Sequence, residues 1–189
     1  MTTKNFHTSL KQGDRGERRA EELFDWLKGR KHLMDWAKTP HYIYEHLGLD
    51  GENDYIFWNK NRSTTGLEVK TLSGCNAAKT FGYDTMVVEE WKDNYGKVRA
   101  GWWIATEAGH LNYIIFVNEY TNKLYWFKTS ILKDYISSRN LYKTSCNDGN
   151  VHNKGQIVKI PWECKEAGWW MTFWKEGDDW MCNTPKEAK

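Results

Sequence analysis

Asp54, Glu68 and Lys70 are two acids and a base that could together form a catalytic site. Asp54 begins a β-rich run at residues 54–58, and Glu68 and Lys70 lie on a second run at residues 66–70. A polar turn joins the two runs, so we expect them to pair as a hairpin. Side chains alternate between the faces of a strand, which puts Glu68 and Lys70 on the same face. The hairpin therefore brings two carboxylates and an amine close together.

Two neighbouring carboxylates repel each other unless a positive charge neutralises them. Their hard oxygens suit Mg²⁺, for which Mn²⁺ can substitute. Such an ion polarises a phosphate and lowers the pKa of a bound water. Lys70 could then orient the attacking water or stabilise the charge that develops on the phosphate. The pattern predicts metal-dependent hydrolysis of a phosphodiester, and the alternative is a cross-strand salt-bridge face with a structural role only.

The same residues resemble the signature of the PD-(D/E)XK nuclease superfamily, which includes many restriction enzymes, archaeal-type Holliday junction resolvases and phage nucleases. Asp54 corresponds to the first acid, and Glu68-Val69-Lys70 corresponds to the E-x-K motif. Asn53 stands where the name-giving proline would be. That substitution is a common variation in the superfamily, and it removes one identifying residue.

An upstream segment strengthens the resemblance. Residues 13–20 read Gly-Asp-Arg-Gly-Glu-Arg-Arg-Ala and resemble the G-x-x-G-E-x-x-A opening helix of several members. In those members a helical glutamate reaches the metal site, which points to Glu17, with Glu21 one turn on as the rival ligand. The alternative is that Asp14 and Glu17 form a capping box at the start of their helix. Residues 51–54 are also similar to a G-E-I-D stretch of one branch.

The resemblance implies a role for each of these residues. Asp54 and Glu68 would bind Mg²⁺ together with the backbone carbonyl of Val69. Lys70 would assist the attacking water or the phosphate, and Glu17 would complete or support the metal site. The expected contacts with the DNA backbone come from basic side chains and one hydroxyl, namely Arg15, Arg18, Arg19 and Thr71.

The elements that must position these residues can be read from the apolar periodicity. A helix is expected over residues 14–28 with Gly29 as its stop, and Thr39-Pro40 is expected to begin a short helix that ends at Gly48. A further helix, begun by Thr129 or Ser130, is expected after a series of strands. The remaining strand candidates are residues 84–90, 101–106, 112–119, 123–128, 156–160 and 169–174.

This order of elements predicts an α/β or α+β domain with a mixed central sheet flanked by helices. The resemblance implies a restriction-endonuclease-like core in the order α-β-β-β-α-β. We assign residues 1–145 to the nuclease core and residues 146–189 to a Trp-rich C-terminal appendix packed on the same domain. Twelve tryptophans are unusual in a chain of 189 residues, and core packing should account for most of them.

Composition narrows the class of protein further. The net charge is +2, which permits binding to nucleic acid without indicating it. Four isolated cysteines, no signal-peptide pattern and no long apolar run predict a cytoplasmic protein with no membrane segment. No phosphate-binding loop is present, so no nucleotide cofactor is expected. The small size fits a phage- or mobile-element-encoded protein.

The function that these observations favour is a DNA endonuclease, structure-selective in the manner of a junction resolvase. The alternatives are a sequence-specific restriction-type endonuclease and a nonenzymatic DNA-binding or interaction module on the same fold. An RNA substrate fits the same residues. A homodimer is also compatible with the sequence, because many members of the superfamily dimerise to cut two strands.

Overall fold

The fold was obtained as a computed structural model. It describes residues 3–40, 54–72, 84–94, 97–100, 111–119, 121–138, 142–148, 151–160 and 170–183.

The long N-terminal helix α1 spans Thr3–Gly29. Its apolar stripe at helical spacing is fully buried, with Ala20, Leu23 and Phe24 all at 0% exposure. The helix expected over residues 14–28 is therefore confirmed, including its end at Gly29. It begins well before Asp14, so Glu17 lies in the helix interior and the capping-box alternative for Glu17 is wrong.

The end of α1 is closed by a Schellman motif. The His32 N–H donates to the Leu27 carbonyl at 2.9 Å, and the Lys31 N–H donates to the Lys28 carbonyl at 3.0 Å. Lys31 takes the left-handed conformation (φ 61°) that glycine usually supplies at this position. Gly29 is the last helical residue but is not the left-handed one.

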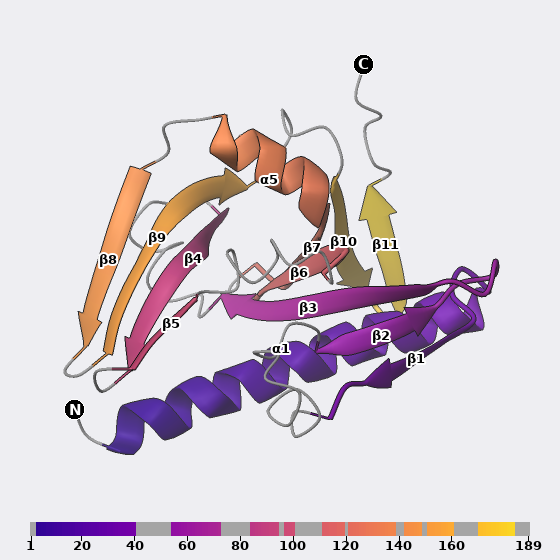
Figure 1. The fold of residues 1–189 in the computed structure, drawn as a ribbon. Helices are drawn as coiled ribbons and strands as arrows, with labels where there is room; N and C mark the ends of the chain where they lie inside the picture. The colour runs from indigo at the N-terminus through magenta and orange to yellow at the C-terminus, as the bar shows by residue number, and fades with distance from the viewer. Residues whose placement is uncertain are drawn as a thin grey trace.

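A seven-stranded mixed sheet lies along one side of α1, in the strand order β1-β2-β3-β6-β7-β10-β11 (Figure 1). All pairs of neighbours are antiparallel except β3 and β6, which run parallel. The expected α+β class with a mixed sheet is confirmed. The strands are β1 (Asp35–Lys38), β2 (Tyr55–Trp58), β3 (Thr64–Leu72), β6 (Tyr113–Asn118), β7 (Lys123–Lys128), β10 (Trp170–Glu176) and β11 (Asp179–Asn183).

The expected hairpin is confirmed as β2 and β3, which pair with Tyr55 opposite Leu67 and Trp58 opposite Thr64. β1, a four-residue strand that the sequence does not predict, covers the outer edge of β2. The short helix expected between Pro40 and Gly48 lies outside the described residues.

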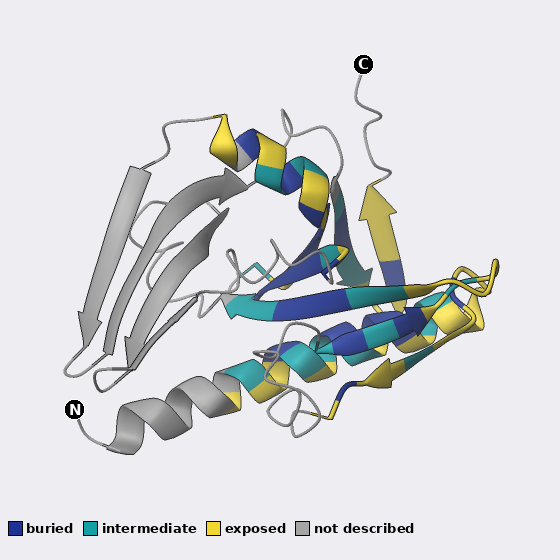
Figure 2. Cartoon of the chain, in the orientation of Figure 1, coloured by how far each residue is buried: buried dark blue, intermediate teal, exposed yellow. Residues whose placement is uncertain are grey.

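Both faces of the sheet are buried at its middle strands β6 and β7, whereas the edge strands β1 and β11 are mostly exposed (Figure 2). On one face α1 packs against a core cluster that includes Leu67, Val69 and Trp126. On the other face lies the second described helix, α5 (Thr129–Ser137), beside β7. Within the described residues the hydroxyl of Thr129 has no hydrogen-bond partner, so Thr129 does not cap α5 through its side chain.

A second, four-stranded antiparallel sheet has the order β5-β4-β9-β8. It includes the strands expected at residues 84–90 and 156–160, while the strand expected at residues 101–106 lies outside the described residues. The described part of the connection from β3 to β6 thus contains β4 and β5. These strands are β4 (Asp84–Asn94), β5 (Lys97–Ala100), β8 (Tyr142–Asp148) and β9 (Val151–Ile160).

The C-terminal strands extend both sheets. β10 pairs with β7 and carries β11 on its outer edge, while β9 pairs with β4. Strands from either side of residue 145 therefore share each sheet. The division into a core and an appendix stays a prediction.

Candidate active site

Asp54 stands at the point where β2 begins beside β3. The register pairs Tyr55 with Leu67, and its continuation by one residue sets Asp54 opposite Glu68. Directly opposed residues in an antiparallel pair have Cβ atoms about 4.5–5.5 Å apart. The Val69 N–H donates to Oδ2 of Asp54 at 2.7 Å, which fixes this carboxylate against the middle of the E-x-K motif. The two acids singled out in the sequence are therefore brought together.

Glu68 and Lys70 share the sheet face that points away from α1. Leu67 and Val69 belong to the core cluster under α1, so the alternating residues between and after them face the other way. The Lys70 ammonium forms an ion pair with Oε1 of Glu68. Glu68 is 3% exposed, whereas one third of the Lys70 side chain is accessible. The pair thus joins a buried carboxylate to a cation at the surface of the site.

A second group of charges lies on the α1 face of the same hairpin. Tyr55 is fully buried, and its hydroxyl donates to Oε1 of Glu21 at 2.7 Å. Burial raises the pKa of the Tyr55 phenol, and the hydrogen bond to Glu21 and the charges of Glu17, Glu21 and Asp54 raise it further. Tyr55 is therefore a neutral donor that ties the helical acid Glu21 to β2.

Lys38, the last residue of β1, lies among these carboxylates. Its ammonium pairs with Glu17 and lies 4.0 Å from Oε1 of Glu21. Its pKa is raised by the hydrogen bond to Glu17 and by the negative charges of Glu17, Glu21 and Asp54, against the opposing effect of partial burial. The sequence analysis missed Lys38 because its strand is only four residues long and has no clear alternation.

Gly16 explains how closely α1 approaches β3. A Cβ atom built on Gly16 would lie 1.8 Å from Oγ1 of Thr71, whereas one built on Gly13 would meet nothing within 4 Å. The second glycine of the G-x-x-G segment is thus a packing requirement. Thr71, which was expected to contact DNA, has its side chain against α1, on the opposite face from Lys70.

The arginines expected to hold DNA have partners within the protein. Arg15 makes two hydrogen bonds to the Glu119 carboxylate, at 2.6 and 3.1 Å, and these raise its pKa. Arg19 donates to Glu22 and Asn122 and stacks over the ring of Trp180. Arg18 is exposed and donates to the backbone carbonyl of Asp14. Their contact with DNA stays a prediction.

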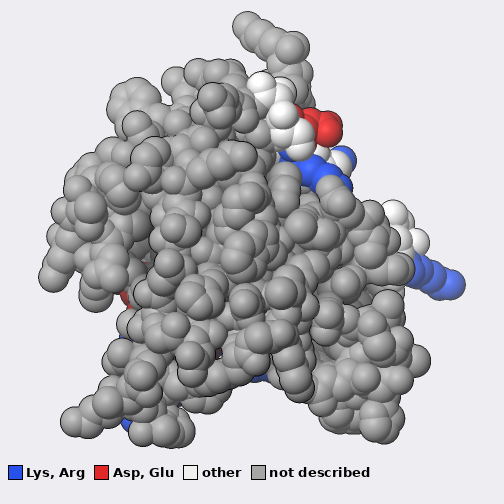
Figure 3. Space-filling view, turned by 60° about the vertical axis from the view of Figure 1, so that its left-hand side comes forward, with Lys and Arg blue, Asp and Glu red and all other residues white. Residues whose placement is uncertain are grey.

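Figure 3 views the molecule from the side of the second sheet, where described Lys, Arg, Asp and Glu side chains appear only in a few places. Within the described ranges, no three His, Cys, Asp or Glu side chains form a group able to hold a metal ion. Neither described helix is long and apolar enough to cross a membrane.

No family model matches the sequence, and no significant match is found among curated proteins. Among solved structures, the chain is similar to a nuclease from a fusselovirus. The two share 13% sequence identity over 84% of each chain, with a TM-score of 0.36. The similarity is loose despite its coverage.

Proposed function

We propose that this chain is a metal-dependent DNA endonuclease with Asp54, Glu68 and Lys70 at its active centre. The observation that carries the proposal is the register of β2 and β3, which sets Asp54 opposite Glu68. The hydrogen bond from Val69 to Asp54 holds that pair together. Burying a carboxylate opposite a second carboxylate, with a lysine on the same face, costs desolvation free energy. Such an arrangement therefore favours a functional role over a purely structural one.

The donor set fits a hard divalent cation such as Mg²⁺ or Mn²⁺. Asp54 and Glu68 would supply carboxylate oxygens. The N–H and C=O of one residue in a strand point toward the same neighbour, so the Val69 carbonyl faces the side on which Asp54 lies. When bound, the cation would polarise the scissile phosphate and acidify an attacking water.

Lys70 would act on the phosphate or on the water. In the structure its ammonium is held by Glu68 at the edge of the buried region. An ammonium has three donors, so Lys70 can keep its bond to Glu68 and still donate to a phosphate oxygen or orient a water. Negative charge that develops on the phosphate would be stabilised there.

Glu17 would support the site through Lys38 instead of by direct contact with Glu68. α1 lies on the opposite face of β3 from Glu68, and Glu17 pairs with Lys38. The negative charge of Asp54 in turn raises the pKa of Lys38. This chain of charges would set the potential at Asp54 and would hold Lys38 away from the metal.

We propose DNA as the substrate, and a structure-selective cut in preference to a sequence-specific one. The exposed guanidinium of Arg18 is suited to phosphate contact. Arg15 would exchange its Glu119 partner for a phosphate on binding. A homodimer would place two such centres on two strands.

The test is a cleavage assay on supercoiled plasmid and on a synthetic four-way junction, each with Mg²⁺, with Mn²⁺ and with EDTA. The wild type should cut in either metal and not in EDTA, and the Lys70→Ala variant should lose the activity. Preference for the junction would support structure selection, and discrete bands from plasmid would support sequence-specific cutting. Binding of DNA without cleavage in any metal would contradict the proposal and favour a nonenzymatic module.

A further inference from the structure

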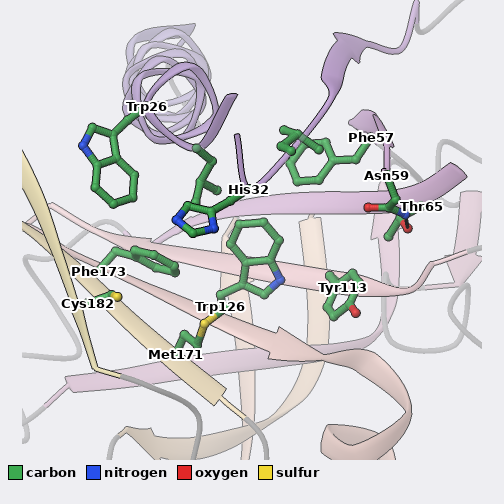
Figure 4. A pocket seen from close by; sticks show the side chains of 12 residues that line it. Trp26, His32, Phe57, Asn59, Thr65, Tyr113, Trp126, Met171, Phe173 and Cys182 are labelled. Atoms are coloured by element: carbon green, nitrogen blue, oxygen red, sulfur yellow. Dashed lines mark hydrogen bonds between the residues drawn. The ribbon is translucent and has the colours of Figure 1, made fainter. Parts of the chain in front are cut away.

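An aromatic pocket lies between α1 and the central sheet, at the far end of the β2–β3 hairpin from Asp54. Its volume is about 350 Å³, near the lower end of the range of about 300–1,000 Å³ for small-molecule sites. His32 and Cys182, which are exposed, lie at its mouth. Five aromatic rings, drawn in Figure 4, form much of its wall: Trp26, Phe57, Tyr113, Trp126 and Phe173.

Trp126 forms the centre of the pocket wall. Its side chain is 7% exposed, and within the described residues its Nε1 has no hydrogen-bond partner. Figure 4 shows the indole in the middle of the pocket with its nitrogen on the side of Tyr113. That nitrogen is sealed from solvent, so the ring offers the pocket apolar stacking surface and no accessible donor.

Asn59 gives the pocket an acceptor. Its Nδ2 donates to the hydroxyls of Ser63 and Thr65, at 3.0 and 2.7 Å. Because the Ser63 hydroxyl already donates to Asn61, it must accept from Asn59, which fixes the orientation of the carboxamide. The remaining Oδ1 is turned toward the other lining residues (Figure 4), and no described residue donates to it.

Three exposed cations are close in sequence to residues that line the pocket. Lys31 precedes His32, and Lys60 and Arg62 follow Asn59 in the hairpin turn. All three are exposed and form no ion pair with any described residue. Neighbouring cations differ in this respect, because Lys28 and Arg30 are both paired with aspartates. A ligand with an anionic group outside the pocket would find its partners here.

We infer that the aromatic pocket binds a single unstacked nucleobase of a DNA strand whose phosphates lie on Lys31, Lys60 and Arg62. A nucleobase is planar, so it fits between the aromatic rings, and it has N–H donors on its edge that complement Asn59 Oδ1. Aromatic side chains stack on bases of any sequence. The identity of the ligand as DNA rests on the proposed function, whereas the pocket's shape, polarity and charge do not.

The pocket is separate from the candidate active site and lies on the α1 face of β3, whereas Glu68 and Lys70 lie on the opposite face. Thr65 lines it and Lys70 lies further along β3. At about 3.3 Å per residue the two are roughly 17 Å apart along the strand. A base captured here would anchor an unpaired nucleotide at a fixed distance from the reactive centre. This would favour DNA with an unpaired or distorted segment over regular duplex.

The test is binding without cleavage, in EDTA, measured by fluorescence anisotropy. Two labelled single strands of equal length are compared, one with bases and one built only of abasic deoxyribose phosphates. The wild type should bind the first at least about tenfold more tightly. Asn59→Ala removes the Oδ1 acceptor and should reduce that preference.

Two tryptophan substitutions on β11 form a matched pair, of which one should fill the pocket and the other should leave it open. Cys182 lies opposite Phe173 and faces the pocket, whereas exposed Met181 points the other way. Cys182→Trp should abolish the preference for the base-bearing strand, and Met181→Trp should leave it intact. Alkylation of Cys182, followed by peptide mass spectrometry, should be slowed by the base-bearing strand alone.

Several results would overturn the inference. They are equal binding of the two strands, binding of neither, or a preference that survives Cys182→Trp. Protection of Cys182 before any DNA is added would mean that another segment or a second copy of the chain fills the pocket. Cleavage without a preference for the base-bearing strand would contradict the pocket inference and not the nuclease proposal. A preference without cleavage would contradict the nuclease proposal and not the pocket inference.

Discussion

Glu17 and Glu21 lie one helical turn apart, and the structure gives them different partners. Glu17 pairs with Lys38, and Glu21 accepts the Tyr55 hydroxyl. We predict that Glu17→Gln lowers the rate of plasmid cleavage about tenfold to a hundredfold, as loss of a supporting partner commonly does. Glu21→Gln keeps an acceptor for Tyr55 and should lower the rate less. An equal or larger loss for Glu21→Gln would make Glu21 the helical acid of the site.

Tyr55 makes a prediction about alkaline stability. Its pKa is raised in the folded protein above the unfolded value of about 10. A raised pKa contributes stability that is complete below the unfolded pKa and is lost as pH rises toward the folded pKa. The free energy of unfolding should therefore fall above about pH 10, and Lys38 adds to the same trend.

The variant Tyr55→Phe isolates this contribution. It removes the hydrogen bond to Glu21, so it should cost about 1 kcal/mol at neutral pH. It should also flatten the alkaline loss, since no phenol remains to ionise. Urea unfolding of both proteins between neutral pH and about pH 11 measures the two slopes. Parallel slopes would show that the Tyr55 phenol titrates in the folded protein as it does in the unfolded chain.

At the scale of elements, α1 comes into close contact with β3 at Gly16, where the helix has no side chain. We predict that Gly16→Ala lowers the free energy of unfolding by about 1–3 kcal/mol, because its Cβ would overlap the Thr71 side chain. Gly13→Ala, in the same helix with open space around it, should raise stability by about 0.5–1 kcal/mol. The double variant Gly16→Ala/Thr71→Ala should recover part of the loss. Thermal or urea unfolding of the four proteins checks the packing.

The sequence predicted the elements that have strong local signals. The buried stripe of α1 and the alternation at Glu68 and Lys70 are periodicities that a single segment expresses by itself. β1 has only four residues, too few to show a periodic pattern of apolar residues. Its place beside β2 is set by backbone pairing with a segment about twenty residues further along the chain. The role of Lys38 was missed for the same reason, because only tertiary contact brings it to Glu17.

At the scale of the whole molecule, residues 170–183 complete the central sheet. Phe173 is 2% exposed and packs with Trp126, while Met181 on the next strand is 41% exposed. We predict that Phe173→Ala costs about 3–5 kcal/mol and that Met181→Ala changes stability by less than about 0.5 kcal/mol. Both variants should unfold in one transition. Two transitions, with only one shifted by Phe173→Ala, would make the C-terminal segment a separate unit.

The distribution of the C-terminal strands between the two sheets could not be predicted from the sequence. The pairing of β9 with β4 and of β10 with β7 joins segments that are far apart in the chain, and no local pattern specifies such partners. The Asp54–Glu68 pair could be predicted because a short hairpin encodes its own register. Most of the candidate site lies on that hairpin, which is why it was more predictable than the fold around it.

The central claim is that the opposed pair of Asp54 and Glu68 is a phosphodiester-cleaving centre. The most direct test is single-turnover cleavage of plasmid DNA in Mg²⁺ by Asp54→Asn, with Asp134→Asn on α5 as the matched control. Asparagine can still accept the Val69 N–H, so the fold should persist while the charge is lost. We predict a loss of at least about 10²–10³ in rate for Asp54→Asn and wild-type cleavage for Asp134→Asn. Cleavage by Asp54→Asn at the wild-type rate would contradict the claim.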